Sequence, residues 1–385
     1  MTSDNPAQHP HTPPTSWDIF CRVIDNHGDL GVCWRLSADL ARRGHSVRLW
    51  VDDLSALSWM APQAFSNPNM HVLPWEDHVQ VQQPNAVVVE AFGCELPAHF
   101  QALMAQFPQT VWLNLEYLSA ESYVVRQHGL PSPVLNGPAK GATKWFFYPG
   151  FTAGTGGLLR EPDVNDRQAR FDPHTWRTQW TSPTPLRTPL RTHERWVSLF
   201  CYEPEALAAW LMQLAQDATP TRLLVTPGRA QHAVRAVLPL LGAEHSALHI
   251  EWLPYLSQTD YDHLLWACDL NFVRGEDSLV RAIWAGKPWV WQIYPQHDQA
   301  HHAKLQALCD QLRMPADVQA VQRQWNGMAH DNLPAFAPSM APFSAEMLTA
   351  WGHWSQATST ALQEQHDLTS QLIEFVRSRM NQDMG

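Results

Sequence analysis

The chain has 385 residues, of which 45% are apolar, so it is long enough for two ordinary cores and too apolar to be generally disordered. Its formal charge of −11 excludes a general binder of phosphate backbones, since such proteins need a basic face. No stretch is apolar enough to span a bilayer, and six scattered cysteines without a CxxC pair indicate buried thiols in a reducing compartment. We therefore expect a soluble, cytoplasmic protein that binds neither nucleic acid nor membrane.

The first half of the chain alternates predicted strands and helices. A polar, proline-rich tail comes first, and its lack of an apolar core argues against a signal peptide. Apolar runs then predict strands, and one helix with apolar residues at helical spacing lies between the first two of them. The strands are expected at 17–24, 45–53, 86–96 and 109–119, and the helix at 30–44. The glycine-rich stretch 144–161 predicts an irregular loop region.

A polar stretch rich in proline and threonine, 163–196, is the expected connection to a second α/β half. That half repeats the pattern, and a long amphipathic helix is expected at 360–380. Its strands are predicted at 196–202, 221–228, 247–256, 270–274 and 288–294, and its helices at 205–216, 261–269 and 278–286. Most of the 19 tryptophans fall in such runs, which indicates a role as core residues.

The fold class expected from this pattern is α/β, with two βαβ-containing halves that face a cleft. The predicted division is a disordered tail at 1–15, an N-terminal Rossmann-like domain at 16–185, a C-terminal Rossmann-like domain at 186–360 and a C-terminal helix at 361–385. Ligands of parallel sheets bind beyond the carboxyl ends of strands, so the loops at those ends are the candidate sites.

One such loop, VRGEDS, precedes a helix in the second half. A helix N-terminus at Ser278 can hold a diphosphate with its unpaired N–H groups, Arg274 can add a charge-assisted contact, and Glu276 can accept hydrogen bonds from sugar hydroxyls. The alternative is a plain helix cap, with Asp277 or Ser278 as the N-cap residue and Glu276 merely exposed.

The other loop, IDNHGDLG, carries two acids in the first half. It has no GxGxxG, so a dinucleotide site is not supported. Asp29 at the base of a helix is also explained by the helix dipole, whereas Asp25 at the end of a strand is harder to explain as a cap. Together they could supply a general base and an electrostatic anchor.

A histidine-rich segment raises the hypothesis of a metal site. His297 and His301 are spaced i, i+4, with Asp298 and His302 beside them, but no further ligand stands at a strong motif distance. We therefore expect no metal site.

Several long motifs of this chain resemble the EarP family, the protein-arginine rhamnosyltransferases that modify translation elongation factor P. They are DNHGDLGVCWRLSADLARRGHSVRLWVDD, LNLEYLSAE, PGFTAGTGGLLRE, SLFCYE, FVRGEDSLVRAIWAGKPWVWQIYPQ and AHHAKL, and the resemblance runs from about Trp17 to the C-terminal helix. It implies the GT-B architecture of two facing Rossmann-like domains, with a C-terminal helix that crosses back to the first.

The resemblance also implies the reaction. The family transfers L-rhamnose from dTDP-β-L-rhamnose to an arginine guanidino nitrogen of elongation factor P, with inversion and without a metal or other cofactor. Asp25, Asp29 and Glu276 are then the expected catalytic acids. The residues expected to bind the nucleotide sugar are Phe200, Tyr202, Gln258, Tyr261, Arg274, Glu276, Asp277, Ser278 and Tyr294. At the position of Tyr261 family members often have phenylalanine, and either ring can pack on a thymine.

An acidic loop suits an arginine acceptor, because a guanidinium is always protonated and a poor nucleophile. Our hypothesis is that Asp29 is the base and Asp25 the orienting acid. Two alternatives stay open at this point: a nucleotide-sugar epimerase of the same architecture, and a non-catalytic module that binds a translation factor.

Overall fold

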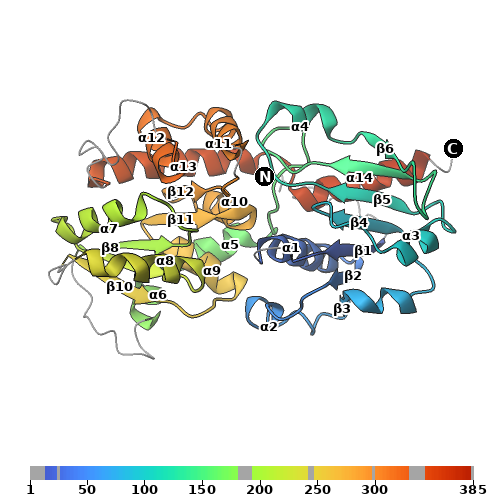
Figure 1. The fold of residues 1–385 in the computed structure, drawn as a ribbon, viewed down its shortest axis with the longest axis horizontal. Helices are drawn as coiled ribbons and strands as arrows, with labels where there is room; N and C mark the ends of the chain where they lie inside the picture. The colour runs from blue at the N-terminus through green and yellow to red at the C-terminus, as the bar shows by residue number, and fades with distance from the viewer. Residues whose placement is uncertain are drawn as a thin grey trace, which may run out of the picture.

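The structure is a computed structural model, and it describes residues 14–23, 27–180, 193–241, 247–296, 300–328 and 343–382. The described residues form two α/β lobes that lie side by side (Figure 1). The N-terminal lobe contains strands β1–β7, and the C-terminal lobe contains strands β8–β12.

The sheet of the N-terminal lobe has the strand order β3-β2-β1-β4-β5-β7-β6, and only β6 runs antiparallel to its neighbour. Its strands are β1 (Ser16–Cys21), β2 (Ser46–Val51), β3 (Met70–Pro74), β4 (Val87–Ala91), β5 (Val111–Leu115), β6 (Pro131–Pro133) and β7 (Thr143–Phe147). Its helices are α1 (Gly28–Arg42), α2 (Leu57–Met60), α3 (Ala98–Met104) and α4 (Ser122–Gln127), with a 3₁₀ turn, η1, at Trp75–Gln80.

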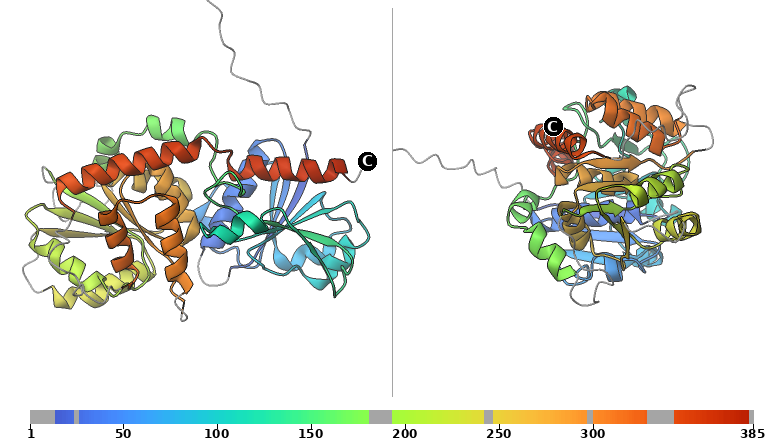
Figure 2. Two further views of the ribbon diagram at one scale, coloured as in Figure 1. Left: turned by 90° about the horizontal axis from the view of Figure 1, so that it is seen from above. Right: turned by 90° about the vertical axis from the view of Figure 1, so that its left-hand side faces the viewer.

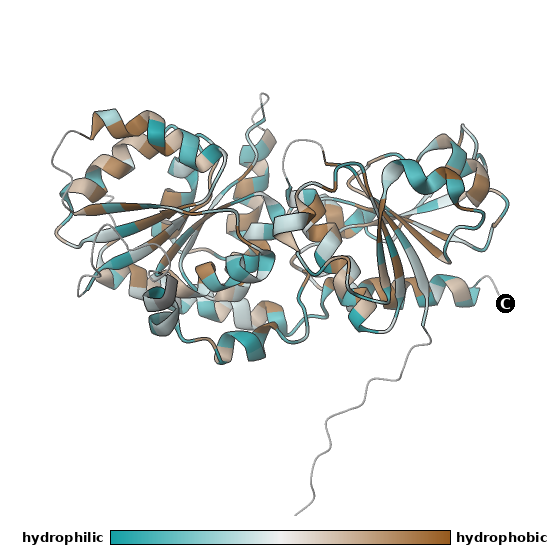
Figure 3. Ribbon diagram, turned by 90° about the horizontal axis from the view of Figure 1, so that it is seen from below, coloured by the Kyte–Doolittle hydropathy of each residue, from teal (hydrophilic) through white to brown (hydrophobic). Residues whose placement is uncertain are grey.

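Both faces of this sheet are covered, which is why most residues of its strands are apolar. Alternate residues of a strand point to opposite faces. Ile19 of β1 therefore packs in the core beneath α1, whereas its neighbour Phe20 packs against Phe100 of α3 on the other face. Figure 3 shows the same apolar character along the strands of both sheets.

The sheet of the C-terminal lobe is parallel and has the order β10-β9-β8-β11-β12. Its strands are β8 (Arg195–Leu199), β9 (Thr221–Val225), β10 (Leu248–Trp252), β11 (Leu270–Arg274) and β12 (Trp289–Gln292). Its helices are α7 (Leu207–Gln216), α8 (Arg229–Val237), α9 (Gln258–Ala267), α10 (Gly275–Ala285), α11 (Ala300–Gln311), α12 (Ala316–Trp325) and α13 (Ala345–Gln363), with a 3₁₀ turn, η2, at Leu238–Leu240.

Each sheet reverses its strand order once, next to its first strand. In the N-terminal lobe the reversal lies between β1 and β4, and in the C-terminal lobe between β8 and β11. Such switch points leave a crevice at the carboxyl ends of the strands, where open α/β sheets bind ligands.

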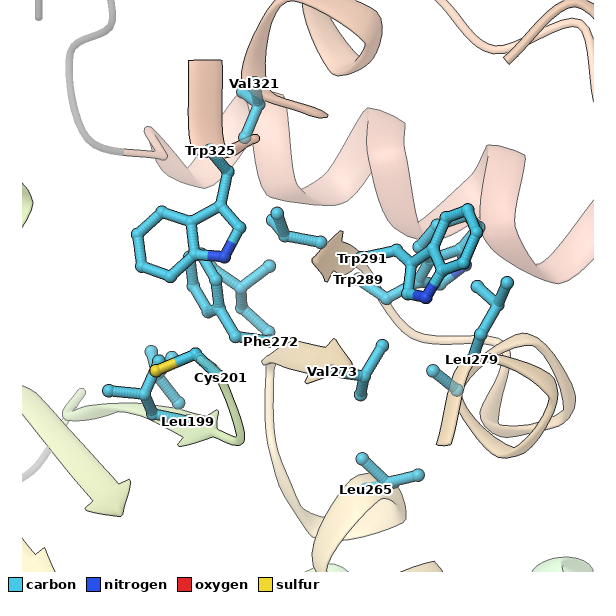
Figure 4. Packing of buried hydrophobic residues seen from close by; sticks show 14 of the residues in the cluster. Leu199, Cys201, Leu265, Phe272, Val273, Leu279, Trp289, Trp291, Val321 and Trp325 are labelled. Carbon is cyan, nitrogen blue, oxygen red and sulfur yellow. The ribbon is translucent and has the colours of Figure 1, made fainter. Parts of the chain in front are cut away.

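Tryptophans fill much of the core, as their place in apolar runs predicted. Figure 4 shows Trp289 and Trp325 packed around the sheet of the C-terminal lobe, with Trp325 against Phe272 at a ring-centroid distance of 4.5 Å. Both tryptophans are almost completely buried. Each large ring removes much apolar area from water, so these residues stabilise the lobe and need no further role.

The polar connection between the lobes holds two short helices, α5 (Val164–Ala169) and α6 (Pro173–Trp180), and its residues 181–192 lie outside the described part. The predicted irregular stretch 144–161 begins instead with strand β7, because its apolar residues pair with β5. The domain boundaries given above stay predictions.

The prediction of a single long helix near the C-terminus is wrong. The structure has two helices there, α13 and α14 (Leu368–Gln382), which follow one another along both lobes (Figure 2). The helix is interrupted because Asp367 accepts the backbone N–H of Ser370 at 2.9 Å, and this N-cap hydrogen bond starts a new helix. Leu372 and Val376 of α14 are buried in the core of the N-terminal lobe, so this helix crosses back as the resemblance implied.

Among the described residues, no helix combines the length and the apolar character that a membrane span requires.

Candidate active site

The first candidate acid, Asp29, lies in the first turn of α1, directly after β1 at the switch point of the N-terminal sheet. Its carboxylate accepts a hydrogen bond from the Tyr117 hydroxyl at 3.4 Å. Burial raises the pKa of Asp29 to about 6, and the bond from Tyr117 opposes that rise. Asp29 is therefore largely ionised at neutral pH but takes up a proton easily. Asp25 lies outside the described residues.

The second candidate loop leads from β11 into α10, and the helix begins at Gly275 rather than at Ser278. Gly275 has a φ of +67°, a left-handed conformation that glycine adopts without strain, so the chain can turn into the helix there. The backbone N–H of Arg274 donates to the Ser278 hydroxyl at 3.1 Å, and that hydroxyl in turn donates to the Arg274 carbonyl.

This arrangement excludes the simple cap considered for Asp277 or Ser278. The N-cap residue is Arg274, and its side chain does not cap the helix. The N-terminal end of α10 thus keeps its positive partial charge next to the switch point of the C-terminal sheet.

The loop after β5 connects the two candidate loops, which belong to different lobes. The backbone N–H of Leu118 donates to the Glu276 carboxyl at 2.8 Å, and Tyr117, the residue before it, holds Asp29. Burial raises the pKa of Glu276 to about 8; the bond from Leu118 opposes this, and the charge of Asp29 adds to it. At neutral pH the site therefore combines an ionised Asp29 with a largely protonated Glu276.

A cluster of aromatic residues lies beside α10. The Arg274 guanidinium sits 4.5 Å from the ring centres of both Phe200 and Tyr202, which follow β8. Tyr261 packs edge-on against Phe200 at 5.8 Å, and Tyr294 against Tyr202 at 5.4 Å. The structure thus brings together these five predicted binding residues, which come from four separate segments.

Two other predicted residues face the N-terminal lobe instead. The Gln258 side-chain amide donates to the Gly31 carbonyl at 3.0 Å, and Asp277 forms an ion pair with Arg35 of α1 at 3.2 Å. The side chains of Gln258 and Asp277 thus bind groups of the N-terminal lobe at the contact between the two lobes.

Sequence reasoning missed Tyr117, the Leu118 N–H and Arg35. A signal existed for the first two, because the motif EYLS follows the buried strand β5, and loops after parallel strands meet at one edge of the sheet. Arg35 sits on the buried side of α1, where the periodicity gave no hint of its partners.

Within the described ranges, no three histidine, cysteine, aspartate or glutamate side chains are grouped as a metal ion would need. His301 accepts the backbone N–H of Gln296 at 3.1 Å, and His302 lies 3.3 Å from the Asn326 carbonyl. The other two residues of the metal hypothesis, His297 and Asp298, are outside the described part.

The two α/β lobes define the fold class of the protein. The fold is similar to that of a UDP-glucosyltransferase from Polygonum tinctorium, with a TM-score of 0.51, 11% identity, and coverage of 96% of this chain and 99% of that one. The chain has the GT-B fold, as expected.

The comparisons also fix the family. The model of the elongation factor P (EF-P) rhamnosyltransferase EarP matches residues 17–377, and the chain belongs to that family. A protein-arginine rhamnosyltransferase of Pseudomonas aeruginosa is 45% identical over 322 residues, which are 79% of this chain and 84% of the relative. A solved structure on EarP-mediated arginine glycosylation of EF-P has 30% identity and a TM-score of 0.63, with coverage of 94% of this chain and 99% of that one. Neither the epimerase nor the non-catalytic module is favoured by these relatives.

Proposed function

We propose that the chain transfers L-rhamnose from dTDP-β-L-rhamnose to an arginine guanidino nitrogen of translation elongation factor P, with inversion at the anomeric carbon. The observation that carries this proposal is the hydrogen bond from Leu118 to Glu276, because the adjacent Tyr117 contacts Asp29 and one loop thus links the two acids that we assign to the donor and to the acceptor. Membership of the EarP family supports the choice of sugar and acceptor. The proposed location is the cytoplasm, where translation factors act.

On the acceptor side, the arginine guanidinium must lose a proton to become a nucleophile. Asp29, with a pKa of about 6, is ionised at neutral pH and can accept that proton as the new N–C bond forms. Asp25 is assigned the role of orienting the guanidinium through a pair of hydrogen bonds.

On the donor side, the bond between the anomeric carbon and the diphosphate breaks, and dTDP leaves with the electron pair. The N-terminus of α10 and the Arg274 guanidinium are placed to stabilise that charge, so the proposal assigns this work to protein groups. Glu276, largely protonated, can donate a hydrogen bond to a sugar or phosphate oxygen. The residues proposed to line the nucleotide-sugar site are Phe200, Tyr202, Tyr261, Ser278 and Tyr294, with Gln258 and Asp277 at its border with the N-terminal lobe.

The test is incubation of the protein with dTDP-β-L-rhamnose and unmodified elongation factor P, followed by mass spectrometry of the factor. We expect a mass gain of one deoxyhexose on a single arginine, and none on a factor in which that arginine is lysine. Consumption of the donor without an adduct would contradict the proposal and favour an epimerase.

A further inference from the structure

A buried cluster of ion pairs joins the two lobes behind the candidate site. It contains three arginines and three carboxylates, and Arg167 connects it further to Asp163. The members are Arg35 of α1, Glu161 at the end of the stretch 144–161, Arg167 of α5, Asp262 of α9, and Asp277 and Arg281 of α10.

Arg35 is the member that the N-terminal lobe contributes. Its guanidinium reaches Glu161 at 3.0 Å, Asp262 at 3.3 Å and Asp277 at 3.2 Å, and its side chain is only 5% exposed. Arg281 completes the arrangement from the other lobe, with Glu161 at 2.5 Å and Asp262 at 2.7 Å. Two arginines of opposite lobes thus share the same two acids.

The helices that carry these groups also carry the proposed chemistry. Asp29 lies in the first turn of α1, which bears Arg35 further along, and Glu276 directly precedes Asp277 in α10. The two helices touch closely, because a side chain at Gly31 would have its Cβ 3.1 Å from the Gln258 amide nitrogen and 3.2 Å from an Asp277 oxygen. A displacement of α1 at Arg35 would therefore change the distance between Asp29 and Glu276.

We propose that Arg35 is a positioning residue for the transfer step: by binding Glu161, Asp262 and Asp277, it fixes α1 against α10 and so sets Asp29 at its working distance from the donor. This role rests on the proposed function. It also means that the two lobes are held in register before either substrate binds.

Loss of Arg35 would act on the site in two ways. It would leave the cluster with an uncompensated negative charge in a buried place, which is strongly unfavourable. It would also release α1 from α10, and a displacement of about 1 Å between reacting groups can lower a rate by about 10²-fold. The contacts of Arg274 with Phe200 and Tyr202 lie within the C-terminal lobe and do not involve Arg35.

The test compares Arg35→Met with Arg35→Lys and with a matched control, Arg222→Met. Arg222 is a fully buried arginine that pairs with Glu194 and Glu251 inside the C-terminal lobe. We expect Arg35→Met to lower kcat by about 10²-fold while the Kd of dTDP changes far less, because Arg35 contacts only Gln258 and Asp277 at the border of the proposed nucleotide-sugar site. Arg35→Lys keeps the charge but cannot bind three acids at once, so its kcat should be intermediate. Arg222→Met should lose thermal stability and keep its kcat at temperatures where it is folded.

A second readout is independent of turnover. Spin labels at Ala102→Cys on α3 and Gln216→Cys on α7, both exposed, report the distance between the lobes, and the six native cysteines are all buried. We expect one narrow distance distribution in the parent protein and in Arg222→Met, and a broadened one in Arg35→Met or, if that variant fails to fold, in Arg35→Lys.

Wild-type kcat in the Arg35 variants, or a fall in kcat with an unchanged distance distribution, would overturn the proposal. If the parent protein itself transfers no rhamnose, the proposed function fails, while the distance measurement still shows whether Arg35 holds the lobes together.

Discussion

Leu118 and Glu276 are joined by a hydrogen bond of 2.8 Å, although they belong to different lobes and stand 158 positions apart in the chain. The bond ties the loop after β5 to the first turn of α10, and the adjacent Tyr117 holds Asp29. One loop therefore contacts both of the acids that we propose for the transfer reaction.

Replacing Asp29 by asparagine should abolish most of the transfer activity, because asparagine keeps the size of the side chain but cannot accept the proton. We expect the rate to fall by about 10²–10⁴-fold, the usual contribution of a general base. The rate is measured as deoxyhexose incorporated into elongation factor P. Asp166→Asn makes the same chemical change at an exposed position of α5 and should leave the rate unchanged. Equal rates for the two variants would rule out Asp29 as the base.

The pH dependence of kcat/KM for the acceptor should show the ionisation of Asp29. With a pKa of about 6, the base is increasingly protonated below that pH, so activity should fall about tenfold per pH unit there. The hydroxyl of Tyr117 stabilises the ionised form, and Tyr117→Phe should therefore move the acidic limb of the profile to higher pH. A limb that stays in place in Tyr117→Phe would show that another group controls it.

Glu276 should make the protein less stable as the pH rises. Its pKa is raised from 4.5 to about 8, so between these values the folded state binds a proton that the unfolded state has lost. The free energy of unfolding then decreases with rising pH and levels off above about 8. Glu276→Gln cannot ionise, and relative to it the wild type should lose about 1–3 kcal/mol across this window, less than the full shift implies because the side chain is only partly buried. Urea denaturation at several pH values measures both slopes, and parallel curves would contradict the assignment.

Gly31→Val should disturb the contact between the lobes. A Cβ at this position already approaches Gln258 and Asp277 to within 3.2 Å, and a branched side chain has no room there. We expect at least about a tenfold loss of kcat through misplacement of Asp29. Gly28→Ala is the control, since a Cβ at Gly28 meets nothing within 4 Å. If Gly31→Val turns over at the rate of Gly28→Ala, close packing of α1 on α10 does not matter for catalysis.

The strand runs and the loops after them were predictable because their signals are local. Buried strands such as β4 are apolar at every position but one, and the helix predicted at 30–44 lies at Gly28–Arg42. The site loops were found by the rule that ligands bind beyond the carboxyl ends of parallel strands.

What could not be predicted depends on partners far away in the chain. The pairing of Arg35 with Asp262 spans 227 positions, and no periodicity reports it. The break before α14 had a local signal, since Asp367 precedes an apolar run, but the amphipathic pattern continues across it and suggested one helix. The start of α10 was misplaced by three residues because the sequence offered Asp277 or Ser278 as the N-cap, whereas the chain turns into the helix at Gly275 with a left-handed φ.

The most direct test of the central claim is a crystal structure of the protein with dTDP-β-L-rhamnose or dTDP bound. The account predicts that the diphosphate lies at the N-terminus of α10 within reach of Arg274, with the anomeric carbon, or the space it would occupy, facing Asp29. A diphosphate bound away from the α10 N-terminus, or an anomeric carbon that faces away from Asp29, would contradict it.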